Sequence, residues 1–299
     1  MEKRRIILTA FGLSCAISTA GCTSKPQESF PAGNSSKIEE EKNVGEEENG
    51  EDPPLKEEIN GSLEEGQETK ETQGEGVEVV YTEELRDEKG EDGVSLLSVK
   101  EIFPSITIKG KEEAAKKIND YYVKEKEEFQ THVNMALSMA KDGYTYAKEE
   151  GMAEEGWNGY MIERSYSTAY SNGKLISILS GNYEYLGGAH PNYGTTADVF
   201  ELSTGERLTL DKIFKNKEAA ISHMEQHIIG QIKERGEENF FPEYEKSIKT
   251  ILEGGFWYFS DRGIEIISNP YMLAPYAAGE IEFTIPYEEL TELKEEYKE

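Results

Sequence analysis

Hydrophobic residues are spread very unevenly along this chain, and their pattern divides it into a leader, a polar segment and a folded region. A short apolar run follows Lys3-Arg4-Arg5, and residues 23–76 contain only scattered large apolar side chains. From Val77 onward, runs rich in Val, Ile, Leu and Phe recur with the periodicity of strands and helices. We therefore expect folding to begin at about Val77.

Alternation of apolar and polar residues predicts most of the secondary structure of this region. Strands are expected over 77–81, 94–109, 159–170, 174–185, 195–202, 207–210, 256–259, 264–267 and 281–285. Apolar residues near helical spacing predict helices over 111–148, 217–233, 241–252 and 287–298. Gly143 could divide the first helix in two, and Pro104 marks an edge or a bend of its strand.

Turn residues then indicate how these strands pair. Ser171-Asn172-Gly173 lies between two alternating runs, which is a strong hairpin pattern. Residues 203–206 and 261–263 separate two further pairs of strands in the same way. Hairpins with helices between the groups predict an α+β fold, in which antiparallel sheets pack against helices.

The first 22 residues have the pattern of a targeting signal. Positive residues precede an apolar stretch of roughly 12 residues, which is shorter than the about 20 that an α-helix needs to cross a bilayer. Ser18-Thr19-Ala20-Gly21 and Cys22 resemble the bacterial lipobox, with Thr19 where leucine is usual. The resemblance implies that a signal peptide, 1–21, is removed, and that a lipid on Cys22 anchors the protein at the extracytoplasmic face of the cell membrane. An ordinary secretory signal is the alternative.

The next segment, 22–76, is predicted to be a disordered acidic tether. Residues 23–76 carry a net charge of −11 and too few apolar residues to offset the chain entropy of folding. A role as a cation-binding or interaction tail is the alternative.

Charge also limits the partners of the folded region. The chain has 60 Asp and Glu against 32 Lys and Arg, and residues 77–299 carry a net charge of −19. Such a surface repels nucleic acid and attracts basic proteins and cations. Both cysteines lie in the first 22 residues, so residues 77–299 can form neither a disulfide framework nor a thiolate metal cluster.

Two histidines come closest to a metal-binding pattern. His223 and His227 lie one turn apart in a predicted helix, a spacing that suits a metal site. In the zinc-protease motif glutamate directly follows the first histidine, whereas Glu225 comes two positions on. No third ligand can be named among so many carboxylates, so we expect no metal and no cofactor. Two packing or surface histidines are the alternative reading.

Catalytic patterns are missing from the sequence as well. There is no G-x-S-x-G nucleophile motif, and the glycine pairs 187–188 and 254–255 lack the lysine of a phosphate-binding loop. Carboxylate pairs carry no information in a chain with 60 acids. We therefore predict a non-catalytic protein. A hydrolase or deacetylase with an unrecognised site is the alternative.

Two stretches with few charges, 183–193 and 269–279, combine tyrosines with turn residues. Rigid aromatic side chains on turns give a large contact area at low entropic cost, so both stretches are candidate recognition surfaces. A structural loop and a buried packing segment are the alternative readings. The candidate ligand-binding residues are Tyr185, Gly188, His190, Pro191, Tyr193, Pro275 and Tyr276.

The same stretches carry a family resemblance. Leu186-Gly-Gly-Ala-His-Pro-Asn192, the segment 200–214, Leu273-Ala-Pro-Tyr-Ala-Ala-Gly279 and the segment 283–287 resemble a bacterial extracytoplasmic family of unassigned function. Residues from about 95 to 180 are similar to the companion domain that also begins the peptidoglycan deacetylase PdaC. Together the two look like the lysozyme-binding ectodomain of the RsiV anti-sigma factors. The resemblance implies a PdaC-type domain over 77–185 and an RsiV-type domain over 186–299.

This resemblance implies a binding or sensor lipoprotein, whose ligand is a basic lysozyme-like protein or cell-wall peptidoglycan. RsiV spans the membrane and carries a cytoplasmic sigma-binding segment. We expect neither here, so sigma-factor control is not carried over. PdaC owes its activity to a separate domain with a Thr-Phe-Asp-Asp motif, which this sequence lacks. A structural domain without a ligand is a further alternative. The sequence carries no pattern that predicts an oligomeric state.

Overall fold

The computed structural model describes residues 68–72, 76–152 and 156–298, all of which belong to one compact unit spanning 59–299. The predicted signal peptide 1–21, Cys22 and most of the predicted tether lie outside the described residues. Among the described helices, none combines the length and the apolar character that crossing a membrane requires.

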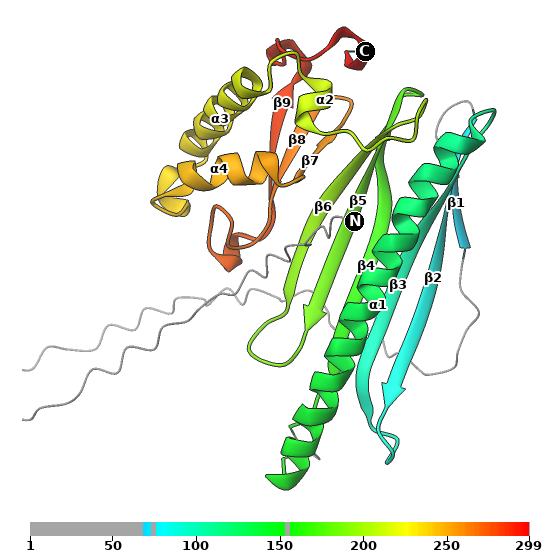
Figure 1. Ribbon diagram of the computed structural model, residues 1–299. Coiled ribbons are helices and arrows are strands. Elements are labelled where there is room, and N and C mark those ends of the chain that lie inside the picture. Colours follow the sequence, from blue (N-terminus) through cyan, green and yellow to red (C-terminus); the bar gives the residue numbers. More distant parts are fainter. Residues whose placement is uncertain (1–67, 73–75, 153–155, 299) are drawn as a thin grey trace, which may run out of the picture. The chain divides into compact units, whose positions relative to one another are not determined.

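A six-stranded sheet, ordered as in the chain, dominates the described part of the protein (Figure 1). Its strands are β1 (Glu68–Thr72), β2 (Val77–Lys89), β3 (Ser95–Ile108), β4 (Tyr160–Ser171), β5 (Leu175–Tyr185) and β6 (Asn192–Glu201). Neighbouring strands pair antiparallel except β3 and β4, which are parallel and joined by helix α1 (Glu112–Glu149). The predicted α+β class, with antiparallel sheets packed with helices, is confirmed.

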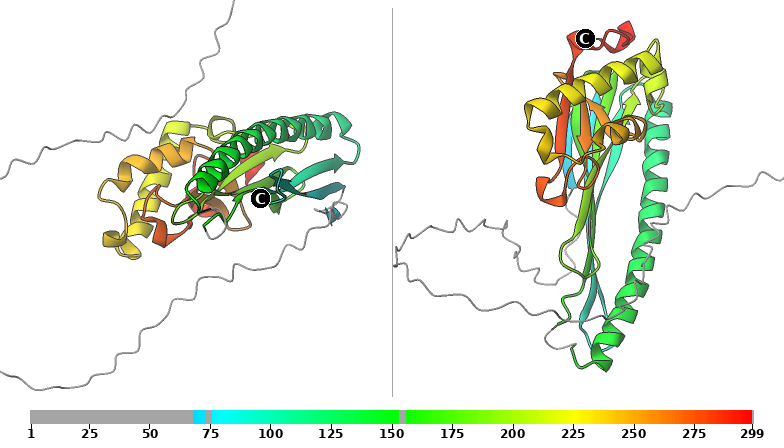
Figure 2. Two further views of the ribbon diagram at one scale, coloured as in Figure 1. Left: turned by 90° about the horizontal axis from the view of Figure 1, so that it is seen from below. Right: turned by 90° about the vertical axis from the view of Figure 1, so that its left-hand side faces the viewer.

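The long helix α1 covers one face of this sheet (Figure 2). After Ala114 and Ala115, its buried residues recur at intervals of three, four and seven, as expected for one face of a helix. The last three of them are alanines, whose small side chains suit close packing on the strands. The buried residues are Ala114, Ala115, Ile118, Tyr122, Phe129, Val133, Ala136, Ala140 and Ala147. Gly143 does not interrupt the helix. An added Cβ there would lie 3.1 Å from the Tyr160 hydroxyl and 3.3 Å from the Trp157 ring, so this glycine makes room for two aromatic side chains.

The C-terminal residues form a second layer on the other face of β5 and β6. Its helices are α2 (Leu210–Ile213), α3 (Lys217–Glu234) and α4 (Tyr244–Glu253), and the short 3-10 turn η1 (Glu237–Asn239) precedes α4. A three-stranded antiparallel sheet follows, made of β7 (Trp257–Phe259), β8 (Gly263–Ser268) and β9 (Ile281–Pro286), with η2 (Tyr276–Ala278) before β9.

Successive side chains of β5 and β6 point to opposite faces of the sheet, so each strand contributes to two hydrophobic cores. Ile176 and Phe200 belong to the core beneath α1, whereas Leu175 and Val199 belong to the core of the C-terminal layer. The predicted domain boundary after residue 185 falls between these two paired strands. The division into domains 77–185 and 186–299 stays a prediction.

Residues 68–72 correct the predicted extent of the tether. They form β1, which pairs with β2, and Lys70 lies 2.6 Å from Glu78 in an ion pair. A polar strand can form at this position because its backbone hydrogen bonds to β2 satisfy its peptide groups, and its side chains need no core.

Pro104 lies on an unpaired edge, as predicted. It stands opposite Tyr81 of β2, beyond Glu101, the last residue of β3 that pairs with β4. A strand with a partner on one side only tolerates a residue that has no backbone donor.

The predicted helix over 287–298 is wrong. Two 3-10 turns, η3 (Tyr287–Glu289) and η4 (Glu295–Tyr297), stand in its place. Between them, Leu293 is fully buried and forms a β-bridge with Phe214. These contacts hold the segment in an extended form, which local helix propensity does not outweigh. The predicted strand over 207–210 reduces to one bridge, between Phe200 and Arg207.

Candidate functional site

The two tyrosine-rich stretches, separated by about 80 residues, meet in the structure. His190, in the loop between β5 and β6, stacks on Tyr276 with ring centroids 4.0 Å apart and planes at 24°. Tyr193 meets the Tyr276 ring edge-on at 5.5 Å, and Tyr271 lies 5.7 Å from the same ring. We call His190, Tyr193, Tyr271 and Tyr276 the aromatic cluster.

Asn269 fastens the second stretch to the sheet. Its side-chain oxygen accepts the Thr195 N–H at 2.7 Å, and its side-chain nitrogen donates to the Thr195 carbonyl at 2.9 Å. Gly194 makes this possible, because an added Cβ would lie 2.9 to 3.1 Å from the Asn269 amide group. The cluster is therefore held at the end of a rigid strand.

The remaining predicted site residues shape the loop that carries His190. Gly188 has a φ of 107°, in the left-handed region that favours glycine, and its carbonyl accepts a hydrogen bond from the Tyr185 hydroxyl at 3.2 Å. The Pro191 carbonyl lies 2.9 Å from the His190 Nδ1 atom. Pro275 directly precedes η2, which contains Tyr276. The candidate residues thus include three of the four cluster rings and residues of the loop that carries His190, but neither Tyr271 nor Asn269, which fastens the second stretch.

Tyr271 has an unusual backbone conformation. Its φ is 68°, and it is the one non-glycine residue with positive φ in the described part of the chain. A bulky residue costs about 1–2 kcal/mol in this region. Its side chain is nevertheless 56% exposed. The Met272 N–H donates to the Asn269 carbonyl at 3.0 Å, so a turn with Pro270 at its second position imposes this conformation, and burial of the ring does not.

The aromatic cluster is accessible although its rings contact one another. Tyr193 is 37% exposed and Tyr271 more so. Partial burial raises the pKa of the Tyr276 hydroxyl, with a smaller contribution from Tyr193, so this hydroxyl stays neutral at physiological pH. The cluster thus offers apolar ring faces with neutral hydroxyl groups, the combination that serves protein interfaces well.

A cleft adjoins the cluster, between α1 and strands β4 to β6. Its volume is about 270 Å³, and Tyr193 and Asn269 form part of its wall. His132 of α1 and Glu184 of β5 form an ion pair of 2.5 Å beside it. Further lining residues are Phe129, Arg164, Asn182, Asn192 and Thr196. The cleft therefore combines hydrogen-bonding groups with apolar and aromatic surface.

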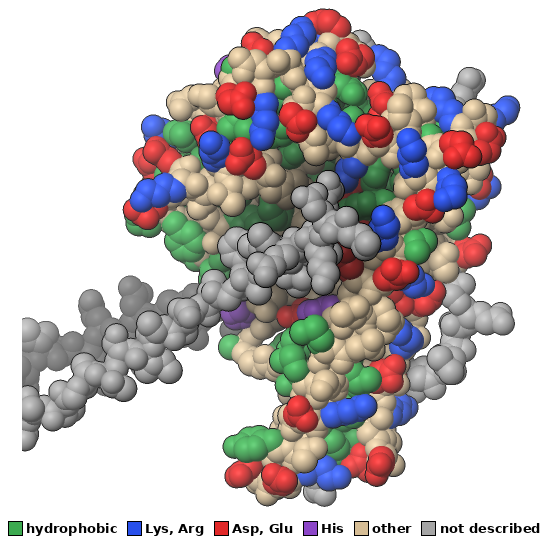
Figure 3. Space-filling view, in the orientation of Figure 1, with side chains coloured by type: hydrophobic (Ala, Val, Ile, Leu, Met, Phe, Trp, Pro, Cys, Tyr) green, Lys and Arg blue, Asp and Glu red, His purple; other side chains and the backbone are tan. Residues whose placement is uncertain are grey.

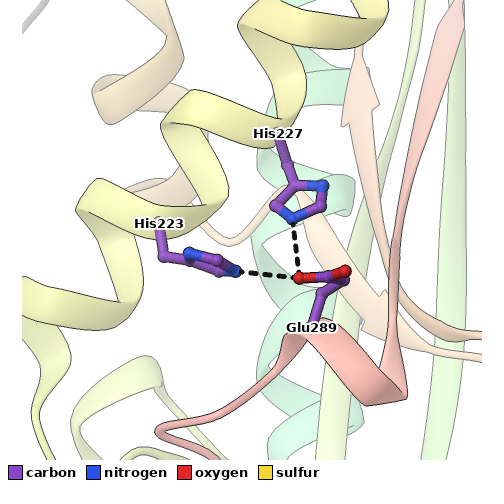
Figure 4. Close-up of side chains that lie close together, drawn as sticks. All are labelled: His223, His227 and Glu289. Carbon is purple, nitrogen blue, oxygen red and sulfur yellow. Dashed lines mark hydrogen bonds and ion pairs between the residues drawn. The ribbon is translucent and has the colours of Figure 1, made fainter.

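The two candidate metal ligands are close together, and the structure adds a third residue to them. His223 and His227 lie on α3 with ring centroids 4.8 Å apart. Glu289 of η3, 62 residues after His227, places one carboxylate oxygen near both rings (Figure 4). Helical spacing predicted the pair, but the carboxylate comes from a segment whose predicted structure was wrong.

Perturbed carboxylates, which the sequence did not identify, lie at the contact between α1 and the sheet, Asp198 on β6 and Glu125 on α1. Asp198 accepts hydrogen bonds from Arg207 at 2.5 Å and from the Tyr121 hydroxyl at 3.0 Å. Burial raises the pKa of Asp198, against the opposing effect of Arg207. Burial also raises the pKa of Glu125. Asp198 shares its strand face with Phe200, but the same face also carries Asn192 and Thr196, so nothing in the local pattern singled out Asp198.

Two segments of the chain match models of known families. Residues 92–193 match the model described as deacetylase PdaC, and residues 211–288 match the model of DUF3298, a protein family of unknown function. The chain pairs these two kinds of domain. Together the matched segments contain all four rings of the aromatic cluster. The second segment also contains His223 and His227, and it ends one residue before Glu289. No curated protein matches the chain.

One solved structure shares the fold, and a second is less similar. A member of the DUF3298 family from Bacteroides fragilis NCTC 9343 is 19% identical, with a TM-score of 0.58 over 73% of this chain and 94% of that one. A DUF3298 family protein from Pseudomonas aeruginosa PAO1 is 14% identical, with a TM-score of 0.42 over 73% of this chain and 93% of that one. The first structure is similar in fold to most of the described residues. At 19% identity this similarity concerns the fold alone.

Proposed function

We propose that this protein is a membrane-anchored, extracytoplasmic binding protein that uses the aromatic cluster to bind a basic lysozyme-like protein. The observation that carries this proposal is the meeting of His190 and Tyr193 with Tyr271 and Tyr276 on an accessible surface, with Tyr271 in a strained backbone conformation. Strain persists where surrounding structure imposes it, and it concentrates at functional sites.

Charge supports a basic partner. The net charge of −19 on residues 77–299 attracts a cationic protein over long range and raises its association rate. Acidic and basic side chains are interspersed on the face shown in Figure 3, so attraction arises from the net charge rather than from one acidic patch on that face. Exposed ion pairs contribute only about 0–1 kcal/mol each, and aromatic anchors supply most interface energy. The cluster would therefore determine how long a complex lasts.

Anchoring would come from the lipid on Cys22, and the tether would hold the binding domain away from the membrane. The lipobox resemblance of residues 19–22 and the acidic composition of residues 23–76 support this arrangement. The resemblance to RsiV supports the choice of lysozyme.

Cell-wall glycan is the second candidate ligand, and the cleft beside Tyr193 favours it. Arg164, Asn182 and Asn192 line this cleft together with aromatic side chains, and sugars are bound by such combinations of hydrogen-bonding groups and ring faces. A deacetylase role rests on the match of residues 92–193 to the PdaC model. We place it after binding, because the Thr-Phe-Asp-Asp motif is absent from the sequence.

A direct binding comparison tests these proposals. The full-length protein, immobilised, would be exposed to a basic lysozyme, to muropeptide fragments and to a basic protein of similar charge without a lysozyme fold. We expect saturable retention of lysozyme alone. Retention of muropeptides alone would replace the protein ligand by glycan. Equal retention of both basic proteins would reduce the interaction to nonspecific charge attraction. Deacetylation of the fragments, abolished by a chelator, would establish the enzyme instead.

A further inference from the structure

The geometry at the C-terminal layer points to a metal-binding site. His227 follows His223 by four positions on α3, so their rings project from one face of the helix. Glu289 of η3 lies opposite this face, and its carboxylate points between the two rings (Figure 4). Two imidazoles and one carboxylate form a common three-ligand set for zinc.

The distances agree with a shared tetrahedral ion. One oxygen of Glu289, Oε2, lies 3.3 Å from the Nε2 atom of His227 and 3.6 Å from the Nε2 atom of His223. Ligands at about 2.0–2.1 Å from a tetrahedral zinc ion lie roughly 3.3–3.4 Å from one another. The candidate ligand atoms of the three residues all fall within 4.8 Å of one another, so small side-chain rotations would suffice.

An unpartnered nitrogen marks the site independently. The Nε2 atom of His223 is buried and has no hydrogen-bond partner, because its 3.6 Å separation from Glu289 exceeds hydrogen-bond length. Leaving a buried polar atom without a partner costs about 1–3 kcal/mol. Coordination of a cation by this atom would remove that cost.

Space and access also suit an ion. A small cavity of about 10 Å³ adjoins His223 and Glu289, which is at the lower limit of the space that can hold one water molecule. It could hold the water that completes a four-coordinate site with three protein ligands. The side chains of His223, His227 and Glu289 are 40%, 29% and 45% exposed, so the site lies near the surface although the Nε2 atom of His223 is itself buried.

We propose that His223, His227 and Glu289 bind one divalent cation of the zinc class, which ties α3 to the segment after β9. Imidazole ligands favour Zn²⁺ over Mg²⁺ and Ca²⁺, which prefer sites made wholly of oxygen. The ion would cross-link two segments about 60 residues apart in the chain, and so stabilise the C-terminal layer. Such a site does not depend on the ligand of the aromatic cluster.

The test uses the full-length protein after treatment with a chelator. Zn²⁺ titration by calorimetry should show one saturable site, and Co²⁺ should give the visible absorption bands of a tetrahedral ion. Excess Ca²⁺ should not compete. The variants His223→Ala, His227→Ala and Glu289→Gln should each lose this site. His132→Ala is the matched control, because His132 also pairs with a glutamate, Glu184, and it should bind Zn²⁺ as the wild type does.

A second readout protects the result against misfolded variants. Zn²⁺ should raise the melting temperature of the wild type and of His132→Ala, and should leave that of Glu289→Gln unchanged while its circular dichroism stays native. The proposal would be overturned if the wild type did not bind Zn²⁺, or if the three site variants still bound it. Glu289 would then simply be a carboxylate that pairs with two histidines. Zn²⁺ retained by the variants would then be assigned to other groups.

Discussion

Asn269 pairs with Thr195 as one strand pairs with the next, accepting its N–H at 2.7 Å and donating to its carbonyl at 2.9 Å. A single side chain therefore connects the residue after β8 to β6, in the segments that carry the stacked rings of His190 and Tyr276. The shape of the aromatic cluster depends on this connection.

Gly194→Ala tests the connection. The added methyl group would meet the Asn269 amide at 2.9 to 3.1 Å and force it away from Thr195. We expect a loss of about 2 kcal/mol in the free energy of unfolding, measured by urea denaturation. Gly230→Ala is the matched control, because Gly230 lies in α3 with open space around its Cβ position and should gain about 0.5–1 kcal/mol. Equal stability of the Gly194→Ala variant and the wild type would show that Asn269 is not held as described.

Tyr271→Gly separates stability from binding. Glycine adopts a φ of 68° without strain, so the variant should be as stable as the wild type, or more stable by up to about 1 kcal/mol. The same change removes one exposed ring from the cluster, and lysozyme should dissociate faster. A variant that unfolds more easily and binds unchanged would make Tyr271 a structural residue.

Asp198 should make stability depend on pH in a particular direction. Burial raises its pKa in the folded state, so the folded state takes up a proton at higher pH than the unfolded state, whose value is about 3.9. The free energy of unfolding of the wild type, minus that of Asp198→Asn, should therefore increase as pH falls from 7. It should become constant below about pH 3.9. Urea denaturation of both proteins at several pH values measures this difference. A difference that shrinks on acidification would mean that Arg207 lowers the pKa more than burial raises it.

Membrane attachment should depend on Cys22. The variant Cys22→Ala removes the thiol that the lipobox resemblance assigns to lipid, and the protein should move from the membrane fraction to the released fraction and stop incorporating radiolabelled palmitate. Cys15→Ala is the control and should remain attached. Unchanged membrane retention of Cys22→Ala would exclude the lipid anchor.

Local patterns in the sequence predicted most of the fold. The hairpin at Ser171-Asn172-Gly173 formed as expected, because Asn172 accepts the backbone N–H groups of Lys174 and Leu175, and Gly173 supplies a φ of 79°. The parallel pairing of β3 and β4 and the extended segment around Leu293 were not predictable in this way. Both depend on contacts between distant parts of the chain, which periodicity does not report.

The candidate site shows the same division. Composition and turn residues identified His190 and Tyr276 separately, but nothing local indicates that their rings stack. His223 and His227 are visible as a helical pair, whereas Glu289 is one of 60 acidic residues until the fold selects it. Strain at Tyr271 has no counterpart in the sequence, because tyrosine has no preference for a positive φ.

The most direct measurement of the central claim is the binding kinetics of a basic lysozyme on the full-length wild type, Tyr276→Ala and Tyr193→Ala, at several salt concentrations. Added salt should slow association equally for all three proteins, and both tyrosine variants should dissociate faster. Tyr146→Ala, which removes an exposed tyrosine of α1 outside the cluster, should behave as the wild type does. Absence of lysozyme binding by the wild type at low salt would contradict the proposed function, and folded tyrosine variants with unchanged dissociation rates would contradict the assignment of the aromatic cluster as its site.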